Sequence, residues 1–386
     1  MDTVRHRLQG PAKPNERHRF IRNLEHTRIA LSSSANSVER RGHEVSESFS
    51  GSQIKSEGCN PMTGGSVGCI ESGVLIGRDG HLFLVGGSHQ VLNMVSGKRC
   101  ISSGSIEAFR QNITDRRQYV HNCVYRHIIF PDKQSVLREQ FPLGDPLCLG
   151  RLYLAKCKDL GGTIYYPQES LCQLGISAYQ RTDTHLSDLG LLTVAVELAS
   201  EIAGRPPPGC LEALLSKLNV EREVTGDLGS KLSPPVESRE RFIHLDWPIS
   251  EFHNMVPGGN NGIVDIYISP DSIYQKRILF FGDSFGRSLC RLLTYFFQEI
   301  LFLRTPYFHP EIFDQYLPDM MITENVERYL DSCSSDADRP SFFMYPYLGG
   351  TKYEPARDFA TAFSAVLSYP RQPHRLFVER IIDLHR

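Results

Sequence analysis

Ser284 is the residue whose surroundings most favour nucleophilic chemistry. It lies in the segment RILFFGDSFGRSL (277–289), where a short apolar run ends at Gly282-Asp283 and is followed by apolar residues at helical spacing. This pattern predicts a strand, a sharp turn and a helix, with Ser284 at the carboxyl edge of the strand. Open α/β sheets bind ligands at that edge, and a helix N-terminus favours developing negative charge. The alternative interpretation is a turn that only caps a helix.

A general base for such a serine is offered by Asp183 and His185, in the segment QRTDTHLSDLGLL. Ser187 or Asp188 can cap a helix that runs to Ala203, so the Asp-Thr-His tripeptide is predicted in the loop just before a helix. Side chains two positions apart in extended backbone leave on the same side, so the carboxylate can orient the imidazole if the loop bends. An oriented imidazole is what a serine nucleophile requires. The alternative is a capped, solvated turn.

Acyl transfer also needs hydrogen-bond donors for an oxyanion. The backbone N–H of Ser284 is the first candidate. Asn325 is the second, because it follows the strand-like segment MMIT (320–323) and would lie on the same sheet edge. Asn325 could equally cap a helix that follows it. His309, at a predicted helix start, and His121, within a predicted helix, are expected to be structural or surface residues.

Composition narrows the possible functions. The chain has 386 residues, 40% hydrophobic and 22% charged, as in an ordinary globular protein. A formal net charge of −2 offers no global attraction for nucleic acid, so no nucleic-acid partner is expected. Ten cysteines are scattered without CxxC pairs, and no His/Cys ligand spacing is present. We therefore expect reduced thiols, no metal and no cofactor.

The chain is expected to have two parts. Residues 1–65 are rich in Arg, Ser, Asn and Gly and predict a disordered leader. Residues 66–386 are expected to form one domain, with a surface excursion over 205–260 that forms a wall for substrate. No apolar run long enough to span a membrane and no signal peptide is visible, which taken literally predicts a cytoplasmic protein.

Local patterns predict the main elements of this domain. Two short strands flank the turn Arg78-Asp79-Gly80 as a hairpin, an amphipathic helix covers 105–127, and a closing helix covers 353–367. After Ser284 the chain alternates strand-like and helical segments. This alternation predicts an α/β fold with a parallel sheet and helices on both faces.

With these segments placed, the chain resembles the SGNH-hydrolase-like domain of the alginate O-acetyltransferase AlgX/AlgJ family. The resemblance covers roughly residues 73–330. It rests on segments in the family's order, which are GRDGHLFL (77–84), FPDK (130–133), DTHL (183–186), GDSFG (282–286), PDMMI (318–322) and ERYL (327–330). Leu186 stands where the family often has tryptophan, which is expected to change the substrate wall.

The resemblance implies a three-layer α/β/α fold with a central, mostly parallel sheet and a circularly permuted order of catalytic motifs. Ser284 then resembles the nucleophile, His185 the general base and Asp183 the residue that orients it. The implied acceptor is a polysaccharide or glycan, the acyl donor would be supplied by a membrane acyltransferase, and the implied location is the periplasm.

Three functions remain open on the sequence. The first is a serine-dependent O-acyltransferase, most simply O-acetyl, that acts on sugar hydroxyls through an acyl-enzyme. The second is a carbohydrate esterase of the same fold, which differs in how well its site excludes water. The third is a non-catalytic polysaccharide-binding or assembly protein. The first is the function we predict.

Overall fold

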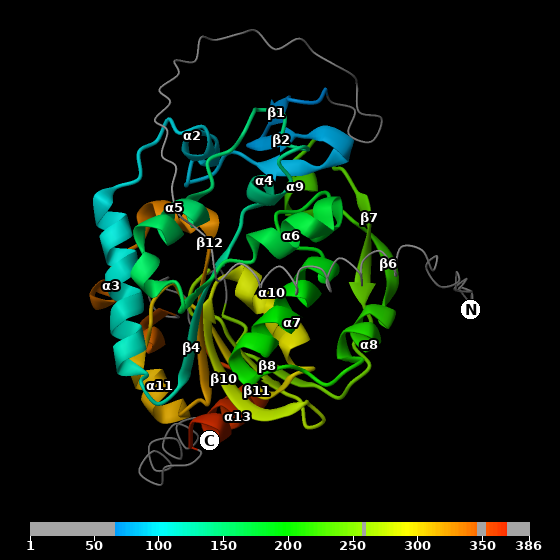
Figure 1. Cartoon of the computed structure of the whole chain (residues 1–386). Coiled ribbons are helices and arrows are strands. Elements are labelled where there is room, and N and C mark those ends of the chain that lie inside the picture. Colours follow the sequence, from blue (N-terminus) through cyan, green and yellow to red (C-terminus); the bar gives the residue numbers. More distant parts are fainter. Residues whose placement is uncertain (1–65, 257–259, 346–352, 369–386) are drawn as a thin grey trace, which may run out of the picture. The chain divides into compact units, whose positions relative to one another are not determined.

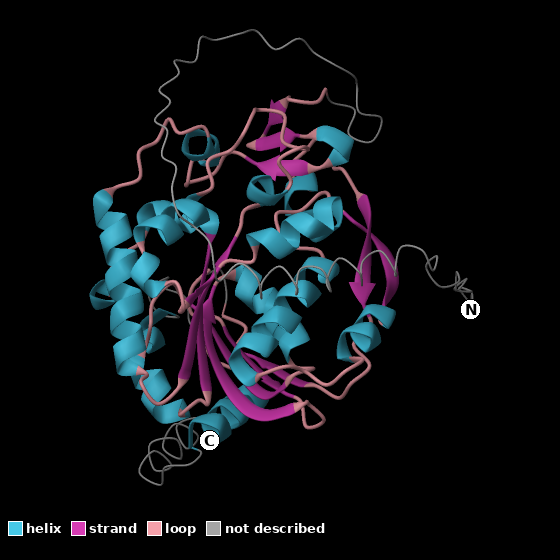
Figure 2. Ribbon diagram, viewed as in Figure 1, coloured by secondary structure: helices cyan, strands magenta, loops and turns pink. Residues whose placement is uncertain are grey.

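The computed structural model describes residues 66–256, 260–345 and 353–368, and the leader predicted over 1–65 lies outside these ranges. Within them, a seven-stranded sheet carries helices on both faces (Figures 1 and 2). The strands, in their order across the sheet, are β5 (Ile164–Tyr165), β4 (Val124–Phe130), β12 (Met320–Val326), β10 (Tyr274–Gly282), β11 (Phe297–Arg304), β9 (Val264–Ile268) and β8 (Ser250–His253).

Strand β10 carries the apolar run that precedes Ser284. Every side chain from Ile278 to Phe281 is buried, as expected for a strand covered on both faces and paired in parallel on both edges, with β11 and β12. Parallel pairing continues through β4 to β5. The predicted mostly parallel sheet is confirmed. Strands β9 and β8 pair antiparallel at the other edge, and the sequence analysis did not predict them.

Helices cover the sheet from two sides (Figure 1). On one face α7 packs against α10 and β4, and on the other α3 meets α11 through the rings of Tyr119 and Phe313. No helix of the described ranges is long and apolar enough to cross a membrane. The helices are α2 (Val91–Val95), α3 (Ser103–Tyr119), α4 (Lys133–Val136), α5 (Leu149–Lys156), α6 (Gln168–Leu174), α7 (Asp188–Ala203), α8 (Cys210–Ser216), α9 (Gly226–Gly229), α10 (Ser284–Leu293), α11 (Pro310–Tyr316) and α13 (Arg357–Ser368).

The helix predicted over 105–127 ends earlier than expected. Helix α3 stops at Tyr119, and the residues from Val124 onward form β4 instead. The reason is tertiary: β4 is held between β12 and β5, and its last four residues are buried. His121 therefore lies in the turn between α3 and β4, not within a helix.

The predicted hairpin is present, and it packs against the excursion. Strands β2 (Val74–Ile76) and β3 (Leu82–Leu84) pair antiparallel, with β1 (Ile70–Glu71) beside β2. The described residues of the excursion over 205–260 contain α8, the antiparallel pair β6 (Leu218–Val224) and β7 (Ser238–Ile243), α9 and β8. A small apolar cluster joins the hairpin to α9 and the residues that follow it, and it consists of Val74, Ile76, Leu82, Leu228, Leu232 and Val236. This cluster anchors the excursion close to the Asp-Thr-His loop.

Candidate active site

Ser284 lies at the junction that the sequence predicted. Strand β10 ends at Gly282, Asp283 caps the next helix by accepting the N–H of Phe285 at 2.8 Å, and Ser284 is the first residue of α10. The first N–H groups of a helix have no partner within the helix, so they are available to an anion. Ser284 is half-buried, and its hydroxyl is placed at the carboxyl edge of the central strand.

The turn around Ser284 is built on a buried carboxyl group. Glu324, in the neighbouring strand β12, accepts the N–H of Asp283 at 2.7 Å and that of Gly286 at 3.3 Å. Burial, and then the nearby carboxylate of Asp283, raises the pKa of Glu324 well above its usual value. A Cβ at Gly282 or Gly286 would collide with this carboxyl group, which explains the two glycines of GDSFG. The sequence analysis missed Glu324, although an acidic residue in a buried apolar strand was a usable signal.

Asp183 and His185 lie on a tight loop before α7. Tyr179 and Leu186 form an isolated antiparallel bridge that closes the loop, and Ser187 caps α7 by accepting the N–H of Gly190 at 3.0 Å. Of the two caps left open by the sequence, the structure uses Ser187. Leu186 is only 1% exposed and packs in the core, and the effect expected of it on a substrate wall stays a prediction.

The structure brings the three side chains together. The Oδ1 atom of Asp183 lies 2.6 Å from Nδ1 of His185, and Nε2 of His185 lies 2.9 Å from the hydroxyl oxygen of Ser284. Burial acts to raise the pKa of Asp183, but the hydrogen bonds and charge of His185 outweigh it and hold that pKa below its usual range. An ionised Asp183 accepts the Nδ1 proton, so the Nε2 lone pair faces Ser284. The ring of Phe285 packs against the imidazole at a centroid distance of 4.8 Å.

Asp227, in α9 of the 205–260 excursion, forms hydrogen bonds with the loop that carries Asp183 and His185. Its N–H donates to the second oxygen of Asp183 at 2.8 Å, and its carboxylate accepts the N–H and hydroxyl of Thr184 at 2.7 and 2.6 Å. Ligand atoms of Asp183, His185 and Asp227 lie within 4.8 Å of one another, a spacing that could hold a cation. The carboxylate oxygens of both aspartates already accept protein hydrogen bonds, so we assign the cluster to hydrogen bonding. The segment expected as a substrate wall supports the loop, and reasoning from the sequence missed Asp227.

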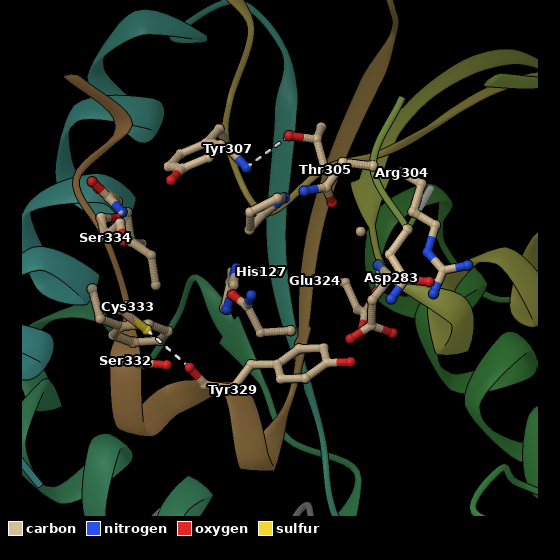
Figure 3. A pocket seen from close by; sticks show the side chains of 18 of the residues that line it. His127, Asp283, Arg304, Thr305, Tyr307, Glu324, Tyr329, Ser332, Cys333 and Ser334 are labelled. Carbon is tan, nitrogen blue, oxygen red and sulfur yellow. Dashed lines mark hydrogen bonds between the residues drawn. The ribbon is translucent and has the colours of Figure 1, made fainter. Parts of the chain in front are cut away.

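A cavity of about 360 Å³ lies near this end of the sheet (Figure 3). Its lining includes Gly282 and Asp283, the two residues before Ser284, but not Asp183, His185 or Ser284 themselves. Asp283, Glu324 and Arg304 lie on one side of it, and Ser332 to Ser334 lie on the opposite side (Figure 3). The Arg304 backbone is directly beside Gly282 in the pairing of β11 with β10. Among the described residues, the guanidinium of Arg304 has no ion-pair partner.

Asn325 lines this cavity from the end of β12. The next element, the 3₁₀ helix over Glu327–Ser332, is preceded by Val326 and has no side-chain cap, so the alternative that Asn325 caps a helix was wrong. Asn325 is half-buried, and its side chain makes no hydrogen bond to any other described residue. His309 and His121 do not line the cavity; His309 is fully buried beside Thr305 and Glu311.

Solved structures with a similar fold come from several bacteria. PatB1 of Bacillus cereus has 12% identity and a TM-score of 0.48, and the match covers 60% of this chain and 92% of that one. A DHHW family protein of Eubacterium siraeum has 14% identity and a TM-score of 0.46, over 69% and 94% of the two chains. The O-acetyltransferase domain of Pseudomonas putida AlgJ has 16% identity and a TM-score of 0.42, over 72% and 99%.

AlgJ belongs to the family whose motifs the sequence resembles. No protein-family model and no curated protein matches the sequence. At these identities and TM-scores, the similarity to solved structures carries no argument about activity.

Proposed function

We propose that this protein is a serine-dependent O-acyltransferase that moves an acetyl group to sugar hydroxyls of a polysaccharide or glycan through an acyl-enzyme. The observation that carries the proposal is the chain of contacts from Asp183 through His185 to Ser284, at 2.6 and 2.9 Å. A nucleophile within hydrogen-bond reach of a base that is itself oriented by a third group is typical of covalent acyl transfer.

The reaction follows from this order of groups. His185 takes the Ser284 proton on Nε2, and the Ser284 oxygen attacks the acyl carbonyl. Asp183 stabilises the imidazolium that forms. The donor's oxygen leaves with the proton held by His185, which gives the acyl-enzyme. A sugar hydroxyl then gives its proton to His185 and attacks the acyl-enzyme. The bond between the acyl carbon and the Ser284 oxygen breaks, and His185 returns the proton to Ser284.

In this proposal two groups are the candidates to stabilise the oxyanion. The first is the Ser284 N–H at the start of α10, and the second is the side-chain amide of Asn325 at the end of the adjacent strand. Donors fixed in advance are the largest single contribution to many acyl transfers, and removal of one typically costs about 10²–10³-fold in kcat.

The cavity supports a sugar as the acceptor. Its lining includes the half-buried residues Asn325, Arg304, Tyr307 and Tyr329, whose polar groups can hydrogen-bond to sugar hydroxyls. A volume of about 360 Å³ is within the range of sites that take small ligands or single sugar units. The donor in this proposal is an acetyl carrier supplied by a membrane acyltransferase, as the family resemblance implies.

An esterase is the second candidate, and one observation favours it. The imidazole of His185 is 26% exposed, so water can reach the group that would activate it. The two reactions share every catalytic residue proposed above. The two reactions differ in the acceptor of the acyl group, which is a sugar hydroxyl in the transferase and water in the esterase.

The test is incubation with p-nitrophenyl acetate, with and without an oligosaccharide, and with Ser284→Ala as the control. Release of nitrophenol together with acetylated sugar is the expected result. Release without acetylated sugar would support the esterase. No release above the level of the Ser284→Ala variant would contradict both and leave a binding protein.

A further inference from the structure

Lys133 is a buried lysine whose ammonium points at the backbone of the catalytic loop. It is the first residue of α4, which begins three positions after the last residue of β4, and it is 3% exposed. Its Nζ donates to the carbonyl oxygens of Gln180, Arg181 and Asp183 at 2.7, 2.8 and 3.0 Å. All three carbonyls belong to the loop that carries His185.

These contacts use the full donor capacity of the side chain. An ammonium group has three N–H donors and no acceptor, and three carbonyl oxygens converge on it. Among the described residues, no carboxylate lies within ion-pair distance of Nζ, although the ring of Phe83 lies 5.5 Å away. The carbonyls of Gln180 and Asp183 have no other hydrogen-bond donor in the described part of the chain. The lysine therefore satisfies buried backbone groups that would otherwise lack a partner.

Burial of this cation is unfavourable. Burial lowers the pKa of Lys133 to about 7, while the carboxylates of Asp183, Glu240 and Asp227 act to raise it and Arg181 acts to lower it further. An apolar side chain of similar length would fill the same space without this penalty. The buried ammonium of Lys133 is explained best by the conformation that its three hydrogen bonds impose on the loop.

We propose that Lys133 is a positioning residue for acyl transfer, whose ammonium fixes three carbonyls of the 180–183 loop so that Asp183 and His185 face Ser284. The effect on acyl transfer rests on the proposed function, whereas the positioning of Asp183 and His185 by Lys133 does not. Because Asp183 accepts both the N–H and the Nδ1–H of His185, movement of its backbone moves the imidazole as well. A displacement of about 1 Å in a catalytic group can cost about 10²-fold in rate.

Asp132, the residue before Lys133, forms hydrogen bonds with the ERYL segment (327–330). The N–H of Asp132 donates to Glu327 at 2.9 Å, and the Asp132 carboxylate accepts Arg328 at 2.5 Å. The guanidinium of Arg328 lies 5.4 Å from the centre of the Phe285 ring, which packs on His185. The segments FPDK and ERYL thus act on the imidazole indirectly, the first through the backbone of its loop and the second through the ring of Phe285.

The test compares Lys133→Met, which keeps length and apolar volume but has no donors, with Lys156→Met, which changes an exposed lysine. We expect Lys133→Met to lower kcat for p-nitrophenyl acetate by about 10²-fold with KM unchanged. Labelling by a fluorophosphonate should slow by a similar factor, and Lys156→Met should match the wild type. Wild-type kcat in a folded Lys133→Met would overturn the proposal.

Chemical rescue separates positioning from general stability. In Lys133→Ala, n-propylammonium replaces the missing atoms and should restore kcat, whereas n-propanol should not. Restoration of the melting temperature by propylammonium without restoration of kcat would show a purely structural role and overturn the proposal.

If Lys133→Met does not fold, the kcat of Lys133→Arg is compared with that of the wild type, because a planar guanidinium cannot aim three donors at converging carbonyls. A folded Lys133→Arg with wild-type kcat would also overturn it.

A spectroscopic readout remains valid even if the protein transfers no acyl group. The proton shared by His185 and Asp183 should give a strongly deshielded NMR signal in the wild type, which is assigned by its loss in His185→Ala. We expect this signal to disappear in Lys133→Met and to return with propylammonium in Lys133→Ala. A wild type that has the signal but neither labels nor releases nitrophenol would refute the proposed function alone. A signal unchanged in Lys133→Met would refute the positioning role alone.

Discussion

The Nε2 atom of His185 lies 2.9 Å from the hydroxyl oxygen of Ser284, although the two residues are 99 positions apart in the chain. No local interaction can produce this contact. It arises because helix α7, which follows the His185 loop, packs against α10, which begins at Ser284. The sheet and this pair of helices bring a base and a nucleophile to one edge of the sheet.

Ser284→Ala should abolish covalent labelling by a fluorophosphonate while the protein stays folded, because the labelled atom is the Ser284 oxygen. Ser288→Ala is the matched control. Ser288 lies in the same helix, and its hydroxyl donates to the carbonyl of Ser284 at 2.9 Å. In-gel fluorescence measures the labelling. A Ser284→Ala variant that still labels would show that another residue is the nucleophile.

His185→Ala and Asp183→Asn should each lower kcat by orders of magnitude, since loss of a triad member typically costs about 10⁴-fold. The double variant should be little worse than His185→Ala, because the carboxylate acts through the imidazole and the effects of residues that act as a unit do not add. Steady-state kinetics on p-nitrophenyl acetate measures all three. Mild losses that add in the double variant would mean that the two residues act independently.

Asp227→Ala should lower both the stability of the protein and kcat. The variant loses two acceptors for Thr184, and hydrogen bonds to a charged group contribute about 1.5–3 kcal/mol each. Asp246→Ala is the control within the same excursion, because Asp246 forms only an exposed ion pair with Lys217, which typically contributes less than about 1 kcal/mol. Urea unfolding and kcat measure the two effects. Equal effects of the two variants would contradict the role of Asp227.

Glu327→Gln should change how stability depends on pH. Burial, and then the carboxylate of Asp132, raises the pKa of Glu327 from 4.5 to about 7 in the folded protein. The folded state then binds the extra proton between these values, so the stability contributed by this group is present below pH 4.5 and is lost as pH rises through about 7.

The glutamine variant cannot ionise, so relative to the wild type it should gain stability as pH rises from about 4.5 to 7. The gain is on the order of 3 kcal/mol, as expected from the size of the pKa shift. Urea unfolding at a series of pH values measures it, and Glu107→Gln, an exposed position on α3, is the control. Parallel stability curves for the wild type and Glu327→Gln would contradict the raised pKa.

The parts of the site that could be predicted from sequence are those with local signals. Gly282-Asp283 between an apolar run and a helix identifies the turn at Ser284, and Ser187 before an apolar helical pattern identifies the loop of Asp183 and His185. The alternation of strands and helices after Ser284 predicts the parallel sheet. The first two of these inferences need only a window of about a dozen residues, and the third needs only the order of elements along the chain.

The supporting residues could not be predicted in this way. Lys133, Asp227 and Glu324 act on residues 38 to 50 positions away. Glu324 has a local signal, because it is an acidic residue in an apolar strand, but the immediate neighbours of Lys133 and Asp227 do not distinguish these two residues from surface charges. Their roles depend on which strands and loops the fold brings together. The excursion was expected to form a substrate wall because its composition is that of an exposed segment, yet α9 within it donates to the catalytic loop.

Mass spectrometry of the acyl-enzyme tests the central claim most directly. The protein is mixed with p-nitrophenyl acetate, quenched in acid within one turnover, and digested to peptides. The predicted result is one acetyl group on the peptide that contains Ser284, which disappears when an oligosaccharide is added and reappears on the sugar. An acetyl group found on another residue, or release of nitrophenol with no adduct on any peptide, would contradict the claim.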